Sequence, residues 1–354
     1  MWDILKAGFT IVMGVVISFG SWPVSTNAGG SGNEFSSDLC PYPSYPNDIQ
    51  PATGLWVEKD KISGDITLHW IDANAGSVAY DVFYTHNKYA WDFASPNATT
   101  TVGASSWTHA GACNDGLNWF YIVRPAGGAD NSTMGYKIVV TLPYNDPALK
   151  TNIYWVSLPY NTTYYKDIRS VIVDIEGGTT GADRDYITSC MVWNYTNQNG
   201  VGMIRGALGW TGGNVALQPG MAICLNRAGC LQTSSYNWVI NGTDVTPTTV
   251  TMPFNDPALK TNNYWVSMPI SGGYATLFSV MIDIEGGLIT TDYIFACMTY
   301  NYTNQARVGM SFSGFGWAGT NYALKPGMVV LLNRAGCDQT TSYAWSVEVL
   351  TPGA

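Results

Sequence analysis

The chain alternates short runs of strand-forming residues with turns, and it holds no long stretch with the 3.6-residue period of an amphipathic helix. Apolar and polar residues alternate in segments 54–58, 65–70, 78–84 and 119–124. Gly, Pro, Asn and Asp residues separate such segments along the whole chain. This pattern predicts an all-β protein.

An internal repeat occupies the C-terminal two thirds of the chain. Segment 145–152, Asn-Asp-Pro-Ala-Leu-Lys-Thr-Asn, returns unchanged as segment 255–262. The motifs Tyr-Trp-Val-Ser, Asp-Ile-Glu-Gly-Gly, Asn-Tyr-Thr-Asn-Gln and Leu-Asn-Arg-Ala-Gly-Cys also recur in the same order. One module is therefore used twice, and we place its copies at 138–247 and 248–354. Because a catalytic site needs to exist only once, residues repeated in both copies are first expected to build the module.

Residues 48–137 precede the repeat and resemble a fibronectin type III domain. In that family Trp70 would be the core tryptophan of the second strand and Tyr80 the core tyrosine of the third. Segment 118–125 would form the sixth strand. The resemblance implies a β-sandwich of about 90 residues.

Each copy of the repeat resembles a module with a Trp-x-Ser-Leu-Pro, Asp-Ile and Pro-Gly layout that recurs in exported and surface proteins of bacteria and archaea. That resemblance implies a small β-sandwich or β-barrel without catalysis of its own. The predicted fold class is therefore all-β. It comprises an N-terminal fibronectin type III-like β-sandwich and two tandem homologous β-sandwich or β-barrel modules.

The N-terminal segment 1–28 has the features of a secretory signal. Lys6 precedes an apolar run that is shorter than the ~20 residues of a membrane span, and small residues follow it. Residues 29–47, rich in Gly, Ser, Asn and Pro, form a linker. Two alternatives stay open. Segment 6–12 resembles the cleavage region of type IV prepilins, or the apolar segment is retained and donated as a strand to a neighbouring subunit.

Cysteine positions support export. Two cysteines recur at matching places in both copies, which predicts one disulfide in each module. Cys224 has Leu331 as its counterpart and is left as a buried thiol or an intersubunit link. The predicted bridges are Cys190–Cys230, Cys297–Cys337 and Cys40–Cys113. Export also permits glycosylation at six Asn-x-Ser/Thr sequons: Asn97, Asn131, Asn161, Asn194, Asn241 and Asn301.

Each copy carries two carboxylates at the same place, in the repeated Asp-Ile-Glu-Gly-Gly motif. Paired acids can serve a glycosidase, and with nearby carbonyls they are oxygen ligands for calcium. We favour a third interpretation, in which they accept backbone N–H bonds at a strand end, because both copies keep them and no ordered calcium-loop motif is present. The residues are Asp174, Glu176, Asp283 and Glu285.

The chain lacks the sequence motifs of several enzyme and cofactor classes. Its three histidines, His69, His86 and His109, lie in the fibronectin-like region, and no zinc, c-type haem, P-loop or nucleophile-elbow motif occurs. We therefore expect no catalytic residues, no enzyme activity and no cofactor, with calcium as the metal that the carboxylates would suit. Charged residues make up 12% of the chain and the net charge is −9, so a nucleic-acid partner is not expected.

Aromatic residues also recur in both copies. They could form stacking platforms for sugars, but tryptophan also fills β-protein cores, and we favour the core for most of them. The matched residues are Tyr154, Trp155, Trp210, Tyr236 and Trp238, with Tyr264, Trp265, Trp317, Tyr343 and Trp345.

Together these features predict a non-catalytic, exported cell-surface structural protein that associates with itself as the subunit of an extracellular filament, sheath or surface layer. The alternative is a carbohydrate-binding or adhesion protein that uses the repeated aromatic faces; a hydrolase ranks last. Because the loop at the start of each copy is retained while its neighbours vary, we predict that it contacts another module or subunit. The residues expected there are Asn145, Asp146, Leu149, Asn255, Asp256 and Leu259.

Overall fold

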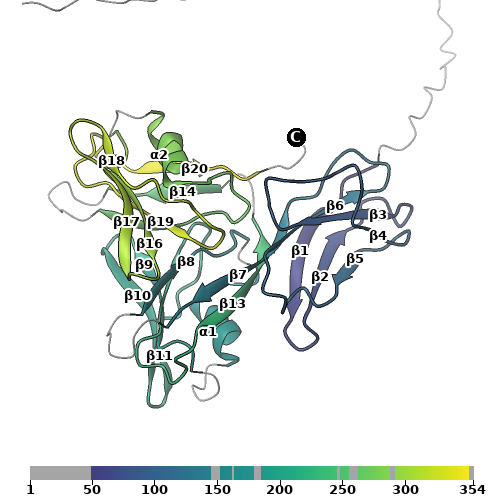
Figure 1. Cartoon of the computed structure of the whole chain (residues 1–354), viewed down its shortest axis with the longest axis horizontal. Helices are drawn as coiled ribbons and strands as arrows, with labels where there is room; N and C mark the ends of the chain where they lie inside the picture. Colours follow the sequence, from purple (N-terminus) through teal and green to yellow (C-terminus); the bar gives the residue numbers. More distant parts are fainter. Residues whose placement is uncertain are drawn as a thin grey trace, which may run out of the picture. The chain divides into compact units, whose positions relative to one another are not determined.

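The computed structural model describes residues 49–144, 152–161, 163–178, 185–244, 248–254, 262–287 and 292–350 (Figure 1). The predicted leader, the linker and Cys40 lie outside these residues. So do the six predicted contact residues of the repeated loop, Asn145, Asp146, Leu149, Asn255, Asp256 and Leu259. No helix in the described part of the chain is long and apolar enough to cross a membrane. The all-β fold class is confirmed, with two short helices that were not expected.

The first domain is a β-sandwich with strand order β1-β2-β5 in one sheet. The other sheet has the order β4-β3-β6-β7-β13, and its last strand, β13 (Tyr236–Thr243), is contributed by copy 1. Trp70 and Tyr80 lie in its core as predicted, 2% and 0% exposed, with ring centroids 5.3 Å apart. Three strands facing four is the arrangement of a fibronectin type III domain, so that predicted fold is confirmed. The strands are β1 (Thr53–Asp60), β2 (Asp65–Ile71), β3 (Tyr80–Thr85), β4 (Ala98–Thr99), β5 (Ser106–His109), β6 (Trp119–Pro125) and β7 (Gly135–Leu142).

The two repeat copies share one architecture, a five-stranded antiparallel sheet with a helix and a two-stranded ribbon. The sheet orders are β11-β10-β9-β12-β8 and β18-β17-β16-β19-β15, and the ribbons are β7–β13 and β14–β20. Copy 1 contains β8 (Ile153–Val156), α1 (Ile168–Glu176), β9 (Ser189–Asn194), β10 (Asn199–Gly206), β11 (Gly209–Gly212), β12 (Ile223–Asn226) and β13 (Tyr236–Thr243). Copy 2 contains β14 (Thr248–Met252), β15 (Asn263–Ser267), α2 (Leu277–Glu285), β16 (Ala296–Asn301), β17 (Ala306–Phe312), β18 (Trp317–Gly319), β19 (Val329–Asn333) and β20 (Tyr343–Val347).

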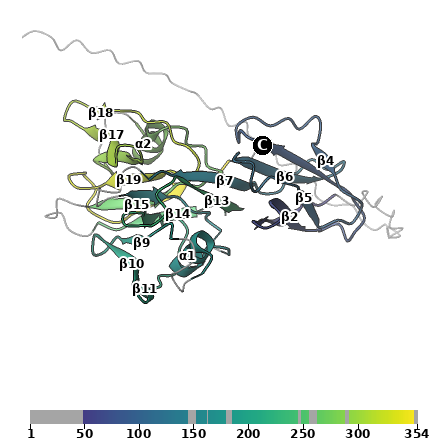
Figure 2. The same ribbon diagram turned by 60° about the horizontal axis from the view of Figure 1, so that its bottom comes forward.

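Strand β7 belongs to the first domain and to copy 1 at once. It pairs with β6 through residues 135–137 and with β13 along its whole length (Figure 2). The boundary predicted between residues 137 and 138 therefore falls inside one continuous strand. No linker separates the two domains, because the sheet of the first continues into the ribbon of the second.

Helices α1 and α2 correct the expectation that Asp-Ile-Glu-Gly-Gly ends a strand. Each helix begins with a capping box, in which Asp167 pairs with Ser170 and Thr276 with Ser279. Each motif supplies the last turn of its helix, and the glycine that follows caps it with a φ of 83° in copy 1 and 68° in copy 2. With nine residues each, these helices are too short to show a 3.6-residue period by eye.

Buried arginines explain the repeated Leu-Asn-Arg-Ala-Gly-Cys motif. Arg227 and Arg334 are both 0% exposed. The Arg227 guanidinium donates to the carbonyls of Tyr186, Leu142, Gln232 and Ser234 at 2.5–3.1 Å. Arg334 donates to the matching carbonyls of copy 2, those of Tyr293, Met252, Gln339 and Thr341. One side chain thus fastens the ribbon and two loops to each module.

Candidate functional site

The two copies pack against each other around a pair of stacked tryptophans. The rings of Trp155 and Trp265 lie 4.3 Å apart between centroids, with an interplanar angle of 5°. Both side chains are buried, at 7% and 2% exposure, in an apolar cluster drawn from β8, β12, β15 and β19. This cluster also contains Ala222, Cys224, Val329 and Leu331. The repeated tryptophan of the Tyr-Trp-Val-Ser motif is therefore an interface residue.

Hydrogen bonds cross this interface in reciprocal pairs. Ser157 Oγ accepts from the Met268 N–H at 2.8 Å, and Ser267 Oγ accepts from the Leu158 N–H at 2.9 Å. The Ser157 N–H donates to the Gly327 carbonyl, and the Ser267 N–H donates to the Gly220 carbonyl. Such reciprocity is the signature of an isologous contact, which here joins two halves of one chain.

The repeated Asn-Tyr-Thr-Asn-Gln turn reaches across to the other copy in the same reciprocal manner. Tyr195 OH donates to the Trp265 carbonyl at 2.9 Å, and Tyr302 OH donates to the Trp155 carbonyl at 2.5 Å. The side-chain oxygens of Gln198 and Gln305 accept backbone N–H bonds, each at 2.6 Å, from the other copy's strand. The tyrosine and glutamine of this repeated turn thus hold the two modules together.

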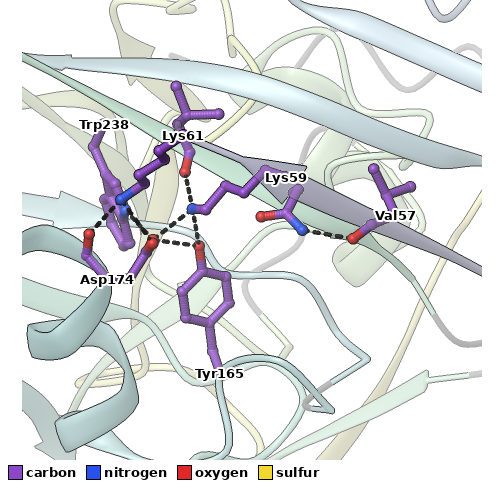
Figure 3. A network of polar contacts seen from close by, with 8 residues as sticks. Val57, Lys59, Lys61, Tyr165, Asp174 and Trp238 are labelled. Carbon is purple, nitrogen blue, oxygen red and sulfur yellow. Dashed lines mark hydrogen bonds and ion pairs between the residues drawn. The ribbon is translucent and has the colours of Figure 1, made fainter. Parts of the chain in front are cut away.

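A buried ion pair joins the first domain to copy 1 (Figure 3). Lys59 Nζ from β1 lies 2.6 Å from Asp174 Oδ2 on α1, and it also donates to the Val239 carbonyl at 2.5 Å. The Lys59 and Asp174 side chains are 1% and 5% exposed. Lys61 adds a second ammonium, 2.9 Å from Asp174 Oδ1.

Copy 1 surrounds this carboxylate with further donors. Tyr165 OH and Trp238 Nε1 donate to Asp174 Oδ2 at 2.9 and 2.7 Å. Asn241 adds a second link to the first domain, since its side-chain amide donates to the Val57 carbonyl at 2.6 Å. Asp174 is therefore fully engaged in holding the two domains together (Figure 3).

Burial and charge act in opposite directions at this pair. Burial lowers the pKa of Lys59 from 10.5 to about 8, although the Asp174 carboxylate pulls it upward. Burial by itself would raise the pKa of Asp174, but the ammonium groups of Lys59 and Lys61 outweigh it and hold that pKa below 3.8. The pair is therefore ionised at neutral pH.

The sequence signal that could have revealed Lys59 is its place in β1. Residues Leu55, Val57 and Lys59 share one face of the strand and are 2%, 4% and 9% exposed. The alternation of β1 therefore places the Lys59 side chain on the buried face of the strand. A buried lysine needs a partner that pairs with its charge. Nothing in the sequence identifies that partner, which lies 115 residues away at Asp174.

Copy 2 holds the counterpart of Asp174 without the lysines. Asp283 on α2 accepts from Tyr274 OH at 2.6 Å and from Trp345 Nε1 at 2.7 Å, as Asp174 does from Tyr165 and Trp238. Within the described residues no lysine or arginine pairs with Asp283. Asp283 is exposed, whereas Asp174 is covered by the first domain.

The two glutamates of the repeated motif accept backbone N–H bonds, as we favoured, but from the end of a helix. Glu176 Oε1 accepts from the N–H groups of Tyr186 and Ile187, and Glu285 accepts from those of residues 292–294. Across the described part of the chain, no group of three or more His, Cys, Asp or Glu side chains could hold a metal ion. The four predicted carboxylates thus act separately, and Asp174 already has two ammonium partners.

The predicted disulfides within the modules are wrong. All six cysteines in the described residues are free and buried: Cys113, Cys190, Cys224, Cys230, Cys297 and Cys337. In copy 2, the thiol of Cys297 donates to the Leu277 carbonyl and that of Cys337 to the Gln339 carbonyl. In copy 1, Cys190 faces the apolar core from β9, while Cys230 lies in the turn after β12 beside Arg227. The cysteines occupy equivalent positions in both copies because they are buried in equivalent environments, and they are not bonded to each other. The partner proposed for Cys113, Cys40, lies outside the described residues.

Most repeated aromatics are core or interface residues. Tyr154, Tyr264, Trp238 and Trp345 are at most 1% exposed. Tyr236 and Tyr343 stack on Tyr186 and Tyr293, with centroids 4.1 and 4.2 Å apart. Trp210 and Trp317 are half-buried and pack against the two module cores. The repeated set does not present one open aromatic face.

Histidines His86 and His109 instead lie in an aromatic cluster at one end of the first domain. The rings of His86 and Trp119 are 3.6 Å apart between centroids, and His109 lies 4.8 Å from Trp119. His69 stacks on the exposed Trp56 and lies 2.9 Å from Glu58 Oε2. No sequence pattern had predicted an aromatic cluster in this part of the first domain.

A groove of about 370 Å³ separates β1 from the loop after β8. Trp56 and Tyr164 flank it and are 48% and 45% exposed.

Two of the predicted glycosylation sequons lie beside this groove, and their asparagines differ in exposure. Asn161 is half-buried in the lining, whereas Asn241 is 0% exposed and its amide nitrogen is bonded to Val57, so the predicted glycosylation at Asn241 is wrong. Asn97 is exposed, and Asn131, Asn194 and Asn301 are half-buried.

No protein-family model matches this chain, and neither does any curated protein sequence. Among solved structures, an Fn3-like protein from Clostridium thermocellum is 21% identical over 24% of this chain and 86% of its own, with a TM-score of 0.20. The FN1–FN3 domains of chicken CNTN1 are 11% identical over 85% of this chain and 99% of their own, with a TM-score of 0.18. The fibronectin-like assignment of the first domain rests on its own strand order.

Proposed function

We propose that this chain is a non-catalytic, exported cell-surface structural protein, the subunit of an extracellular filament, sheath or surface layer. The observation that carries the proposal is the way its three domains are fixed to one another. Strand β7 is shared by two of them, and the Lys59–Asp174 pair is buried between the same two. A stacked tryptophan pair and reciprocal hydrogen bonds join the two copies.

This construction favours a load-bearing role. Interfaces between domains of one chain are commonly small and polar, and they permit relative motion. Here the first domain also reaches copy 2, because Lys88 Nζ donates to the carbonyls of Ile270 and Gly272 at 2.9 and 2.5 Å. Each domain thus contacts both others, and a subunit of this kind transmits force without bending at its joints.

Assembly requires a contact between subunits, and we place it at the repeated loops 145–152 and 255–262. The double variant Leu149→Asp/Leu259→Asp should assemble poorly while keeping the wild-type thermal midpoint. Electron microscopy of purified protein and sedimentation at high concentration measure assembly directly. A wild-type chain that stays monomeric at every concentration would contradict the role. The role needs no cofactor, so EDTA should leave both assembly and the thermal midpoint unchanged.

A second candidate function is glycan binding or adhesion at the groove between β1 and copy 1. Exposed Trp56 and Tyr164 offer stacking faces, and Asn161 and Thr163 offer hydrogen-bonding groups beside them. A glycan array should then lose its signal with Trp56→Ala and Tyr164→Ala. The half-buried Trp317→Ala is the matched control, since it lies away from this groove and should leave binding intact. If glycan binding is lost in Trp317→Ala but kept in Trp56→Ala and Tyr164→Ala, the repeated aromatic residues form the binding site and the groove does not.

A further inference from the structure

The difference between the two copies lies at one surface. We define the Asp283 face as Tyr274, Asp283, Trp345 and Glu348 of copy 2. Its first three residues have the same side-chain types and hydrogen bonds as Tyr165, Asp174 and Trp238 of copy 1. In copy 1 this arrangement binds a lysine of the first domain. In copy 2 the same arrangement is present without a cation among the described residues.

The charge of the Asp283 face favours a cationic partner even more than its occupied counterpart does. Asn241, which donates to the Val57 carbonyl in copy 1, has Glu348 as its counterpart, three residues after the same tryptophan. Glu348 and Asp283 are both exposed. Copy 2 therefore offers two carboxylates where copy 1 offers one carboxylate and one amide, and neither carboxylate forms a salt bridge within the described residues.

We propose that the Asp283 face is a docking surface for a lysine-bearing β-strand of a β-sandwich domain on another polypeptide chain. Asp283 binds the lysine ammonium of that strand as Asp174 binds Lys59. Asn241 in copy 1 donates a hydrogen bond to the Val57 carbonyl, whereas its counterpart Glu348 binds a second cationic side chain of the partner. The partner is not a second copy of this chain, because Lys59 of an intact copy is already buried against its own Asp174. Docking at the Asp283 face does not require filament formation.

The β1–β2 hairpin of this chain supplies a probe. A synthetic peptide of residues 53–71 carries Lys59 on β1 and Lys61 in the turn directly after it, the two lysines that copy 1 already binds. We expect it to bind the full-length protein at the Asp283 face, because the copy 1 face is covered by the chain's own hairpin. Fluorescence anisotropy of the labelled peptide measures this binding, and raising the salt concentration should weaken it.

Matched variants locate the binding. Asp283→Asn/Glu348→Gln in the full-length chain should weaken the peptide about tenfold or more, since charged hydrogen-bond partners are lost. A K59E/K61E peptide should not bind. Both substituted side chains are exposed, so the variant should keep the wild-type thermal midpoint.

Four results would overturn the proposal. The wild-type peptide could fail to bind at all, or bind the Asp283→Asn/Glu348→Gln variant as tightly as the wild type. Binding that disappears in Asp174→Asn but persists in Asp283→Asn/Glu348→Gln would mean that the peptide displaces the chain's own β1. Concentration-dependent self-association that Asp283→Asn abolishes would assign the face to a second copy of this chain.

Discussion

Replacing Asp174 by asparagine removes the charge from the junction between the first domain and copy 1 while keeping its shape. Asparagine retains an oxygen that can accept from Tyr165 OH and Trp238 Nε1. Lys59 then keeps a buried ammonium, 1% exposed, that has lost its nearest carboxylate. Breaking a buried pair by removing one partner typically costs about 3–5 kcal/mol of the free energy of unfolding, so a loss of that size is expected.

The repeat supplies the matched control. Asp283→Asn makes the same chemical change among the same tyrosine and tryptophan donors, but at an exposed site without a lysine. It should change the free energy of unfolding by no more than about 0.5 kcal/mol. The double variant Lys59→Met/Asp174→Asn should recover most of the loss, because it removes the unpaired ammonium that causes it.

Urea unfolding followed by tryptophan fluorescence measures these differences, and acid unfolding gives an independent check. The folded-state pKa of Asp174 lies below its ordinary 3.8, so the stability it contributes is present above about pH 3.8 and is lost as the pH falls through the folded pKa. Asp174→Asn should lack this acid-labile contribution. Equal losses for Asp174→Asn and Asp283→Asn, or no recovery in the double variant, would refute the assignment of this pair as the lock between the domains.

Three further predictions concern the modules. Trp155→Ala and Trp265→Ala should each destabilise the protein by about 3–5 kcal/mol in urea unfolding, whereas the half-buried Trp317→Ala should cost less. Glu285→Gln and Glu176→Gln should each weaken backbone hydrogen bonds at the end of a helix and cost about 1–3 kcal/mol; an unchanged free energy of unfolding in both variants would contradict the helix-end role. Alkylation followed by mass spectrometry should modify Cys190, Cys230, Cys297 and Cys337 in unfolded, unreduced protein, whereas a bridge would protect its pair. Burial raises the pKa of these thiols, so the native protein should react slowly.

Period-two alternation and the duplicated motifs were enough to predict the β-sheets, the sandwich core at Trp70 and Tyr80, and the presence of two like modules. The two helices were not predicted because each has only nine residues, and its sequence signals are limited to a capping box at the start and a glycine at the end. The domain boundary was misplaced because β7 is a single apolar strand that belongs to two domains. The amino-acid sequence of a strand does not reveal which other strands it pairs with. The disulfides within the modules were mispredicted because sequence spacing does not show which way two cysteines face.

The site was harder to predict for a related reason. Its contacts join Lys59 to Asp174 and Trp155 to Trp265, pairs that are far apart in the chain. An inward-facing lysine can be recognised from strand alternation, but its partner is fixed by docking of whole domains. The repeat predicted that residues shared by both copies have a structural role. It did not predict the reciprocal contacts between the copies, because no sequence motif indicates that the module packs against its own duplicate.

That repetition also indicates where specific function lies. Residues kept in both copies, such as Trp155 and Trp265 or Arg227 and Arg334, are used for construction, because each copy makes the same bonds with them. Specific recognition must then arise where the copies differ. The largest such difference with a chemical consequence is the one between Asp174, sealed by two lysines, and Asp283, exposed beside Glu348. A duplicated module thus keeps one face for its own chain and leaves the equivalent face for another.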